Sequence, residues 1–315
     1  MTPDASLAAL SNTFFSVSVG LYSLAVVAFC AQLAFGLRPA RQLVAAGSAE
    51  LPASDVPTAR TDVAVEPETG RRWGVVAVVL TALGAVAHAG VLVTRGMATD
   101  RLPWGNMYEF ATAAVLVGVV AYLAFAVRTP GLRHIGLFVM GPAVLGLVAI
   151  GLFLYAEAGP LVAALRSSWL AVHVSTAILG FGIFFVSGIA SVLYLLRSRA
   201  GAATDGLVAR LPSATALDRV AHRTAVFGFP IWTFAVIAGA IWAESAWGRF
   251  WGWDPKETWA FIAWVVYAAY LHARTTAGWR GAAAAWVNVV GLAVMIFNLL
   301  FVNMVSTGLH SYAGV

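Results

Sequence analysis

Eight long apolar stretches constrain this chain more than any other feature of its sequence. Each is long enough to cross about 30 Å of hydrocarbon as a helix that rises about 1.5 Å per residue. They lie near residues 14–36, 73–94, 108–127, 135–155, 169–196, 226–246, 256–273 and 284–306. We therefore predict an all-α, polytopic integral membrane protein with about eight transmembrane helices.

The composition supports this fold class. Hydrophobic residues make up 61% of the 315 residues and charged residues 10%, with a mean hydropathy of +0.84. Soluble domains are roughly half apolar and about a quarter charged. The single cysteine, Cys30, excludes an internal disulfide, a CxxC redox pair and a covalent CxxCH haem site in this chain. The net charge of +5 accompanies no basic cluster with RNA-binding aromatics, so nucleic acid is not a predicted partner.

The polar segments between these stretches suggest how the chain is organised. The residues before the first stretch lack a basic n-region and a clear cleavage site, which favours a retained helix over a signal peptide. Residues 37–72 are rich in Pro, Ala and charged residues and are assigned no fold. Residues 200–224 could form a short amphipathic helix along the membrane surface. We expect two helices and their polar loop in residues 1–100, and six helices in residues 101–315.

The positions of the basic residues predict the orientation in the membrane. Fourteen of the nineteen Lys and Arg residues fall in the alternate loops 37–72, 128–134, 197–225 and 274–283. The other side of the membrane holds the remaining five, Arg95, Arg101, Arg166, Arg249 and Lys256. Basic residues are concentrated in cytoplasmic loops. The bias therefore places the first set in the cytoplasm, and both termini and the loop between the sixth and seventh helices outside.

That external loop has an unusual sequence, WGRFWGWDPKETW, at residues 247–259. It contains four tryptophans and two glycines, Trp247, Trp251, Trp253, Trp259, Gly248 and Gly252. An interfacial aromatic belt explains an isolated tryptophan, but it needs only one ring at each helix end. Glycine lets the backbone approach a flat partner closely. We therefore predict an aromatic shelf for a large, planar, amphipathic ligand. Asp254 and Glu257 also have a structural explanation, because an N-cap and a capping box start the seventh helix.

Two histidines indicate the ligand. His173 lies about one turn into the fifth helix from its external end, and His310 follows the eighth helix on the same side. Taken singly, each would be a hydrogen-bonded structural histidine, but two imidazoles beside an aromatic shelf resemble axial ligands of haem iron. Arg249 and Lys256 are candidate partners for the propionates, although both could be ordinary interfacial charges.

A third histidine, His272, lies within the seventh helix. Its position seventeen residues after Pro255 puts it roughly 25 Å further in, near the inner leaflet. An ionisable group at that depth indicates a functional site, although an interfacial histidine next to Arg274 is the alternative. A second external stretch, LPWGNMYEF at residues 102–110, predicts another aromatic, hydrogen-bonding turn. There the alternative is a plain turn followed by the acidic first-turn residue Glu109.

The loop sequence resembles the tryptophan-rich WWD signature of the haem-handling proteins of cytochrome c maturation. Together with the external histidines, the LHSY end and the PWGNMYE turn, it is similar to the CcsA/ResC branch, the membrane haem-handling half of the system II cytochrome c synthase. The match runs from about residue 100 to the C-terminus and includes a WWD region at 242–259. The first hundred residues match in pattern alone.

The resemblance implies roles for the residues already singled out. Haem b would be held on the external face by the loop, including Asp254, with His173 and His310 as axial ligands. His272 would bind haem on its way from the cytoplasm, and its second ligand would come from a ResB/CcsB-type partner. The resemblance also implies a bacterial plasma membrane location, apocytochrome c as client, and the possible involvement of thiol-reducing proteins.

Two other functions stay open at this point. One is haem export or delivery without ligation, as in the CcmC-type WWD proteins, which typically have fewer spans. The other is a membrane scaffold or a quinone-linked electron carrier with an ordinary aromatic belt. A haem absorption band in the purified protein excludes this last class, and covalent attachment to a CxxCH reporter distinguishes a synthase from a delivery protein.

Overall fold

A computed structural model of the chain describes residues 3–36, 68–129, 133, 135–160, 165–200, 208, 211–306 and 308–310. Within these residues the regular structure is helical. The helices are α1 (Ala5–Gly36), α3 (Glu68–Thr99), α4 (Met107–Arg128), α5 (Gly136–Phe153), α6 (Ser168–Arg199), α7 (Ala214–Trp247), α8 (Pro255–Thr275) and α9 (Ala282–Met304). The predicted all-α membrane fold is confirmed.

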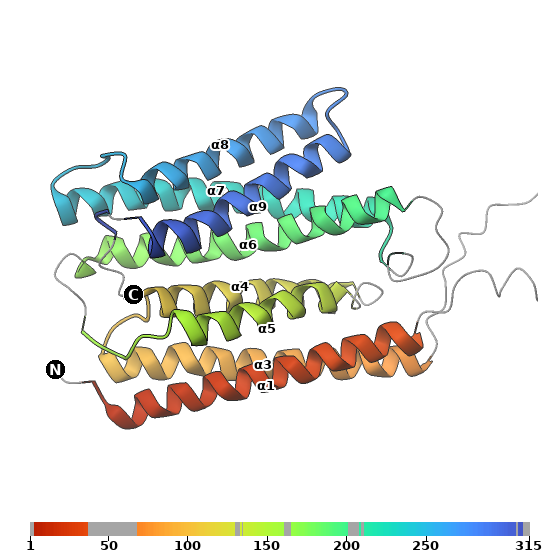
Figure 1. Cartoon of the computed structure of the whole chain (residues 1–315), viewed down its shortest axis with the longest axis horizontal. Helices are drawn as coiled ribbons and strands as arrows, with labels where there is room; N and C mark the ends of the chain where they lie inside the picture. The colour runs from red at the N-terminus through yellow and green to blue at the C-terminus, as the bar shows by residue number, and fades with distance from the viewer. Residues whose placement is uncertain are drawn as a thin grey trace, which may run out of the picture.

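Seven of the helices in the described part of the chain are long and apolar enough to cross a membrane. The exception is α8, whose first turn contains Lys256 and Glu257 and whose last turn contains His272 and Arg274. Figure 1 shows α8 beside α7 and α9, and it contacts both helices. We therefore treat it as the eighth helix of the bundle, as the sequence predicted.

Residues 214–224, the last part of the segment 200–224 in which a short amphipathic helix was predicted, belong to α7. Ser213 caps the N-terminus of α7, where its side chain accepts a hydrogen bond from the Ala216 N–H, and the helix then runs unbroken to Trp247. Leu217, Ala221 and Ala225 are buried along this first part. This spacing of four residues keeps one apolar stripe against the bundle, so the helix extends past the hydrophobic stretch. Residues 201–207 and 209–210 lie outside the described residues.

The polar loop predicted at residues 37–72 is shorter than expected. Its last five residues, 68–72, already belong to α3, and residues 37–67 lie outside the described part of the chain. The helix carries the charged residues Glu68, Arg71 and Arg72 in its first turns. Helical hydrogen bonding does not depend on apolar side chains, so a helix can begin before its hydrophobic stretch does.

The helices form an elongated bundle of paired elements. Figure 1 shows α1 and α3 along one side, α6 to α9 along the other, and α4 and α5 between them. Within the first pair, Gly84 on α3 faces the ring of Tyr22, and a Cβ there would lie 2.6 Å from it. The Tyr22 hydroxyl is 3.2 Å from Nδ1 of the fully buried His88. His88 thus packs between α1 and α3, as expected of a structural histidine.

One end of the bundle collects the segments that matter for function. It holds the start of α1, the α3–α4 and α7–α8 connections, the end of α5, the start of α6 and the described residues after α9 (Figure 1). The N-terminal segment is tied there by the Asp4 N–H, which donates to the Ala98 carbonyl at 2.9 Å. This end, here called the site end, brings the tryptophan loop beside the segment that carries His310.

Candidate functional site

A cavity opens at the site end between α6, α7, the start of α8 and the segment after α9. Its polar and aromatic lining includes His173, Trp242, Trp247, Trp251, Lys256 and His310. The space inside it that a water-sized molecule can occupy is about 100 Å³, and the cavity is partly open to solvent. Sites for small molecules and cofactors are typically mostly apolar with few polar groups. The two external histidines predicted from sequence thus line one cavity.

His173 is held in a defined orientation by α7. Its Nδ1 lies 2.8 Å from the carbonyl oxygen of Ala235. A carbonyl can only accept, so Nδ1 carries the proton and Nε2 carries the lone pair. The imidazole also lies against Gly239, where an added Cβ would come within 2.7 Å of the ring. Any larger residue at position 239 would therefore displace the imidazole.

His310 is oriented by the residue that starts α8. Its Nδ1 lies 3.0 Å from Oδ1 of Asp254, and Oδ2 of the same carboxylate accepts the Leu309 N–H at 2.9 Å. Asp254 is also the N-cap of α8, where its side chain accepts the Lys256 N–H, and Glu257 completes the capping box. The helix-start interpretation of Asp254 is therefore correct, and the same carboxylate also fixes a histidine.

The charge states of this pair follow from their surroundings. Burial alone would raise the pKa of the Asp254 carboxyl, but the hydrogen bonds from His310, Leu309 and Lys256 hold that pKa below its usual value. Burial lowers the pKa of His310, against the opposing effect of its hydrogen bond to Asp254. At neutral pH the carboxylate is ionised and the imidazole is neutral. Nδ1–H therefore donates to Asp254, and Nε2 carries the lone pair that a metal requires.

Trp242, which the sequence reasoning did not select, contacts both imidazoles. Its ring stacks on His173 with a centroid separation of 5.9 Å and meets His310 edge-to-face at 5.8 Å. Trp247 meets His310 edge-to-face at 5.0 Å. Trp242 lies in the last turns of α7, only five residues before Trp247. Its closeness in sequence to Trp247 is the signal that could have identified Trp242. The two rings pack on each other with their centroids 4.8 Å apart.

The aromatic shelf is narrower than the sequence indicated. Of the four loop tryptophans, Trp247 and Trp251 line the cavity. Trp253 is 64% exposed and packs on Trp251 and Phe261 at 5.8 and 6.0 Å, and Trp259 packs on Phe297 at 4.4 Å. Trp253 also has a φ of 58°, an outlier for a bulky residue. This backbone turn directs its ring away from the cavity.

The two loop glycines serve the loop backbone. Gly248 ends α7 as its C-cap in the left-handed region, with φ 70°. Gly252 lies so close to the guanidinium of Arg249 that an added Cβ would collide with it. Arg249 is in turn paired with Glu257, at 3.2 Å. Of the two cations predicted to meet propionates, Arg249 therefore supports the loop, while Lys256 lines the cavity.

His272 is not brought to this cavity. It lies in the last turn of α8, at the opposite end of the bundle, with an exposed side chain. Its backbone carbonyl accepts the Thr276 N–H at 3.1 Å as α8 ends. The structure therefore separates the three predicted histidines into a pair at the site end and a single imidazole on the far surface.

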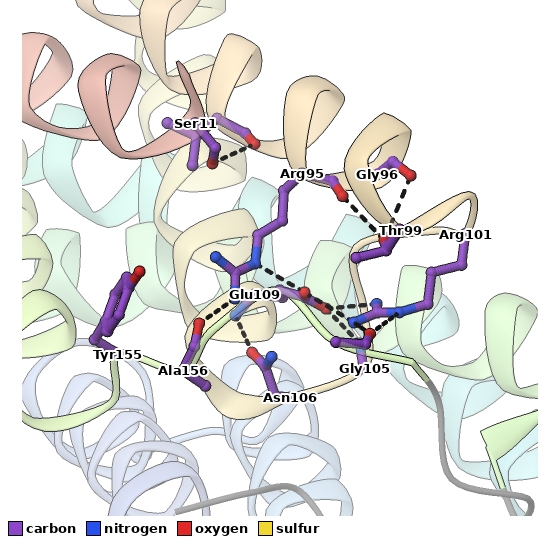
Figure 2. Close-up of polar contacts among 12 residues, drawn as sticks. Ser11, Arg95, Gly96, Thr99, Arg101, Gly105, Asn106, Glu109, Tyr155 and Ala156 are labelled. Carbon is purple, nitrogen blue, oxygen red and sulfur yellow. Dashed lines mark hydrogen bonds and ion pairs between the residues drawn. The ribbon is translucent and has the colours of Figure 1, made fainter. Parts of the chain in front are cut away.

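The α3–α4 turn forms a second wall of the site and is held by a buried ion cluster (Figure 2). Glu109 is fully buried, 2.9 Å from Nε of Arg95 and 2.8 Å from a guanidinium nitrogen of Arg101. Its carboxylate also accepts the Gly105 N–H at 2.6 Å, and Asn106 caps the Glu109 N–H at 2.9 Å. Glu109 thus does more than start α4, because it fixes the whole turn.

The fold and the cavity together define the class of protein, a polytopic helical membrane protein with two imidazoles in an aromatic cavity at one end. The family model described as cytochrome c assembly protein matches residues 104–310. The chain belongs to this family, and its role lies in cytochrome c maturation.

Sequence relatives agree with the family model. The chain is 34% identical to the cytochrome c biogenesis protein CcsA of Gloeobacter violaceus over 290 residues, covering 74% of this chain and 84% of that protein. It is 36% identical to CcsA of Guillardia theta over 259 residues, covering 74% and 83%. The solved structure of the cytochrome c haem lyase CcmF has a TM-score of 0.62 and 16% identity, covering 98% of this chain but 48% of that one. This last likeness concerns the fold, and the chain spans about half of that structure.

Proposed function

We propose that this chain is the haem-handling subunit of a system II cytochrome c synthase in the bacterial plasma membrane. One observation carries the proposal. Two histidines from distant segments, His173 and His310, converge on one aromatic cavity, and each donates Nδ1–H to an oxygen acceptor. Metal-binding histidines characteristically donate their second nitrogen in this way. Family membership and the CcsA relatives support the same function.

The residues present fit haem b as the substrate. In the described part of the chain, no group of three or more His, Cys, Asp or Glu could hold a bare metal ion. Two imidazoles suffice for iron that a porphyrin already surrounds. The Nε2 atoms of His173 and His310 would be the axial ligands, and the rings of Trp242, Trp247 and Trp251 would enclose the macrocycle. Haem itself supplies the vinyl groups that react with the thiols of an apocytochrome CxxCH segment.

The work of the protein in this reaction is positioning. A reactant held in the correct geometry gains a large rate advantage without any acid–base group. The Ala235 carbonyl and the Asp254 carboxylate keep the two imidazoles in place, and the mostly apolar lining would contact the macrocycle. The distribution of basic residues supports an external location of the site end, which is the side that an exported apocytochrome would reach.

Removing one imidazole at a time tests the proposal. We expect His173→Ala and His310→Ala to lose the bis-imidazole haem spectrum, and added imidazole to restore part of it by filling the space left by the side chain. His222→Ala, in the first turns of α7 at the far end of the bundle, is the matched control. Retention of a normal spectrum and full maturation activity by both site variants would contradict the assignment.

A second readout distinguishes synthase from delivery protein. Covalent haem attachment to a CxxCH reporter should require this chain together with a ResB/CcsB-type partner. Haem binding and release without any contribution to thioether formation, with the partner present, would favour the delivery function.

A further inference from the structure

We propose that an apolar hollow between α4, α5, α6 and α9 is a lateral entrance, through which haem dissolved in the bilayer reaches the cavity at the site end. The inference rests on the proposed function and adds a route for the ligand to it. The hollow is lined by small and large apolar residues, among them Gly118 on α4, Gly146 on α5, Phe181 on α6 and Leu299 on α9. Every described residue that lines it is apolar.

The first observation is that the hollow adjoins the cavity. Phe181 and Leu299 line both spaces, and on α4 the cavity residue Phe110 directly precedes the hollow residue Ala111. The side chains of Phe181 and Leu299 therefore form the partition between the two spaces, and both are only partly buried. Rotation of a side chain is much faster than movement of a whole helix. Under this proposal the partition opens by side-chain rotation while the helices stay in place.

The second observation is the space available on each side of the partition. The cavity offers about 100 Å³ to a water-sized molecule, whereas the hollow offers about 390 Å³. Sites for small molecules and cofactors usually measure about 300–1,000 Å³. The hollow therefore provides the room that a porphyrin needs on its way in and that the cavity lacks.

The third observation is the surface onto which the hollow opens. Among its lining residues, Phe153 at the end of α5 is 68% exposed and Leu300 on α9 is 44% exposed. Both helices are long and apolar enough to cross a membrane, so these exposed side chains face lipid. The hollow lies beside the first half of α4 and the last turns of α9, close to the site end (Figure 1). With the orientation expected from the basic residues, its mouth faces the outer half of the bilayer.

The fourth observation is that the axis of the bundle is packed on the inner side of the cavity. Phe184 on α6 and Tyr267 on α8 are fully buried there, and their rings stack with centroids 3.5 Å apart. Phe184 also meets the ring of Trp232 edge-to-face at 6.4 Å, and Trp232 lines the cavity. These three rings occupy the path along the axis, so the hollow is the more open approach from the membrane.

The chemistry of the hollow selects the ligand. An apolar lining offers no partner to a charged or strongly polar compound, whose burial would be unfavourable. A porphyrin has a large planar apolar surface, which gains free energy by leaving water. Its central iron is the part that the imidazoles of the proposed site would bind. We therefore assign the hollow to haem in the outer half of the bilayer, and the test separates this ligand from a lipid acyl chain or a helix of a partner chain.

The test fills the hollow without touching the imidazoles. A Cβ at Gly118 or at Gly146 would have no neighbour closer than 4.0 Å, so both positions accept a larger side chain. The full-length chain with Gly118→Leu or Gly146→Leu is reconstituted in vesicles of phosphatidylethanolamine and phosphatidylglycerol. Haem is then added, and the rise of the bis-imidazole Soret band is followed by stopped flow. We expect each variant to take up haem about tenfold more slowly than the wild type, because the added side chain obstructs the entrance.

The final spectrum and the haem affinity at equilibrium should match the wild type, because neither glycine lines the cavity. Gly141→Leu is the matched control, since it makes the same change on α5 outside the described lining of the hollow, where a Cβ would meet nothing within 4 Å. We expect it to take up haem at the wild-type rate.

Three results would decide against the proposals. Wild-type uptake rates in both hollow variants would overturn the entrance, leave the bis-imidazole site standing, and indicate that a lipid chain or a partner helix covers the hollow. Slower uptake together with a weakened final spectrum, or equal slowing by Gly141→Leu, would also overturn the entrance, because it would report a general structural change. A wild-type chain that gives no bis-imidazole spectrum would instead refute the proposed function.

Discussion

At the residue scale, Asp254 combines two tasks that are usually separate. One carboxylate caps α8 and accepts hydrogen bonds from Leu309 and His310. The capping task could be predicted from the local sequence, because Asp, Pro and Glu stand at the standard positions. The histidine task could not, because His310 lies 56 residues further along the chain. Local patterns do not report contacts at that separation.

This dual role predicts a graded response to substitution. Asp254→Asn keeps an acceptor but loses the negative charge, and we expect haem affinity to fall about 10- to 100-fold, as for other supports of metal-binding histidines. Asp254→Ala should add a loss of stability of about 1 kcal/mol from the missing helix cap. Haem titration and thermal unfolding measure the two effects. The control is Asp218→Asn, which breaks an ion pair between α7 and Arg274 far from the cavity. If Asp254→Asn binds haem as tightly as the wild type, Asp254 does not support His310 as a ligand.

At the element scale, the helices were predictable and their ends were not. Eight apolar stretches identified all eight helices of the described residues, since each stretch must satisfy its backbone hydrogen bonds internally in a bilayer. Hydrophobicity marks only the part in hydrocarbon, so α3 and α7 begin earlier than predicted. Which helices pack against each other was not predicted either, because that depends on which small residues face a neighbouring helix.

Gly182 on α6 allows such a close approach. A Cβ at this position would lie 2.6 Å from Val117 and 3.1 Å from the Ala114 carbonyl, both on α4. We expect Gly182→Ala to push α4 and α6 apart and to cost about 1–3 kcal/mol, seen as a lower unfolding temperature in detergent. Gly20→Ala on α1 is the control, because its Cβ would meet nothing within 4 Å. Equal unfolding temperatures of the two variants would contradict this prediction and show that the α4–α6 contact accommodates the added methyl group.

At the scale of the whole molecule, the sequence singled out several residues that line the cavity, but not how they are arranged. His173, His310, Trp247, Trp251 and Lys256 all line the cavity. The turn at 102–110 was noticed as a polar aromatic motif, yet its place opposite Lys256 depends on how α4 packs against α6. Trp253 and Trp259 belong to the same motif but face elsewhere, since ring direction depends on backbone dihedrals that composition does not fix.

The exposed position of His272 gives a prediction for the assembled complex. The exposed imidazole of His272 is accessible to a partner chain. We expect His272→Ala to reduce the haem that co-purifies with the two-chain complex, while the isolated chain titrates with haem as the wild type does. The pyridine haemochrome assay measures both. Unchanged haem content in the complex would make His272 a structural residue.

The two imidazoles of the cavity are held by different sets of contacts. His173 projects from the body of α6 and is locked to the backbone of α7 at Ala235 and Gly239, so it can retreat only if two long helices separate. His310 follows the last helix on a short segment that Asp254 ties to α8. Freeing His310 requires the loss of its contacts with Asp254 and the neighbouring rings, whereas freeing His173 requires α6 and α7 to separate. Under the proposed function, a client histidine would therefore replace His310 more readily than His173.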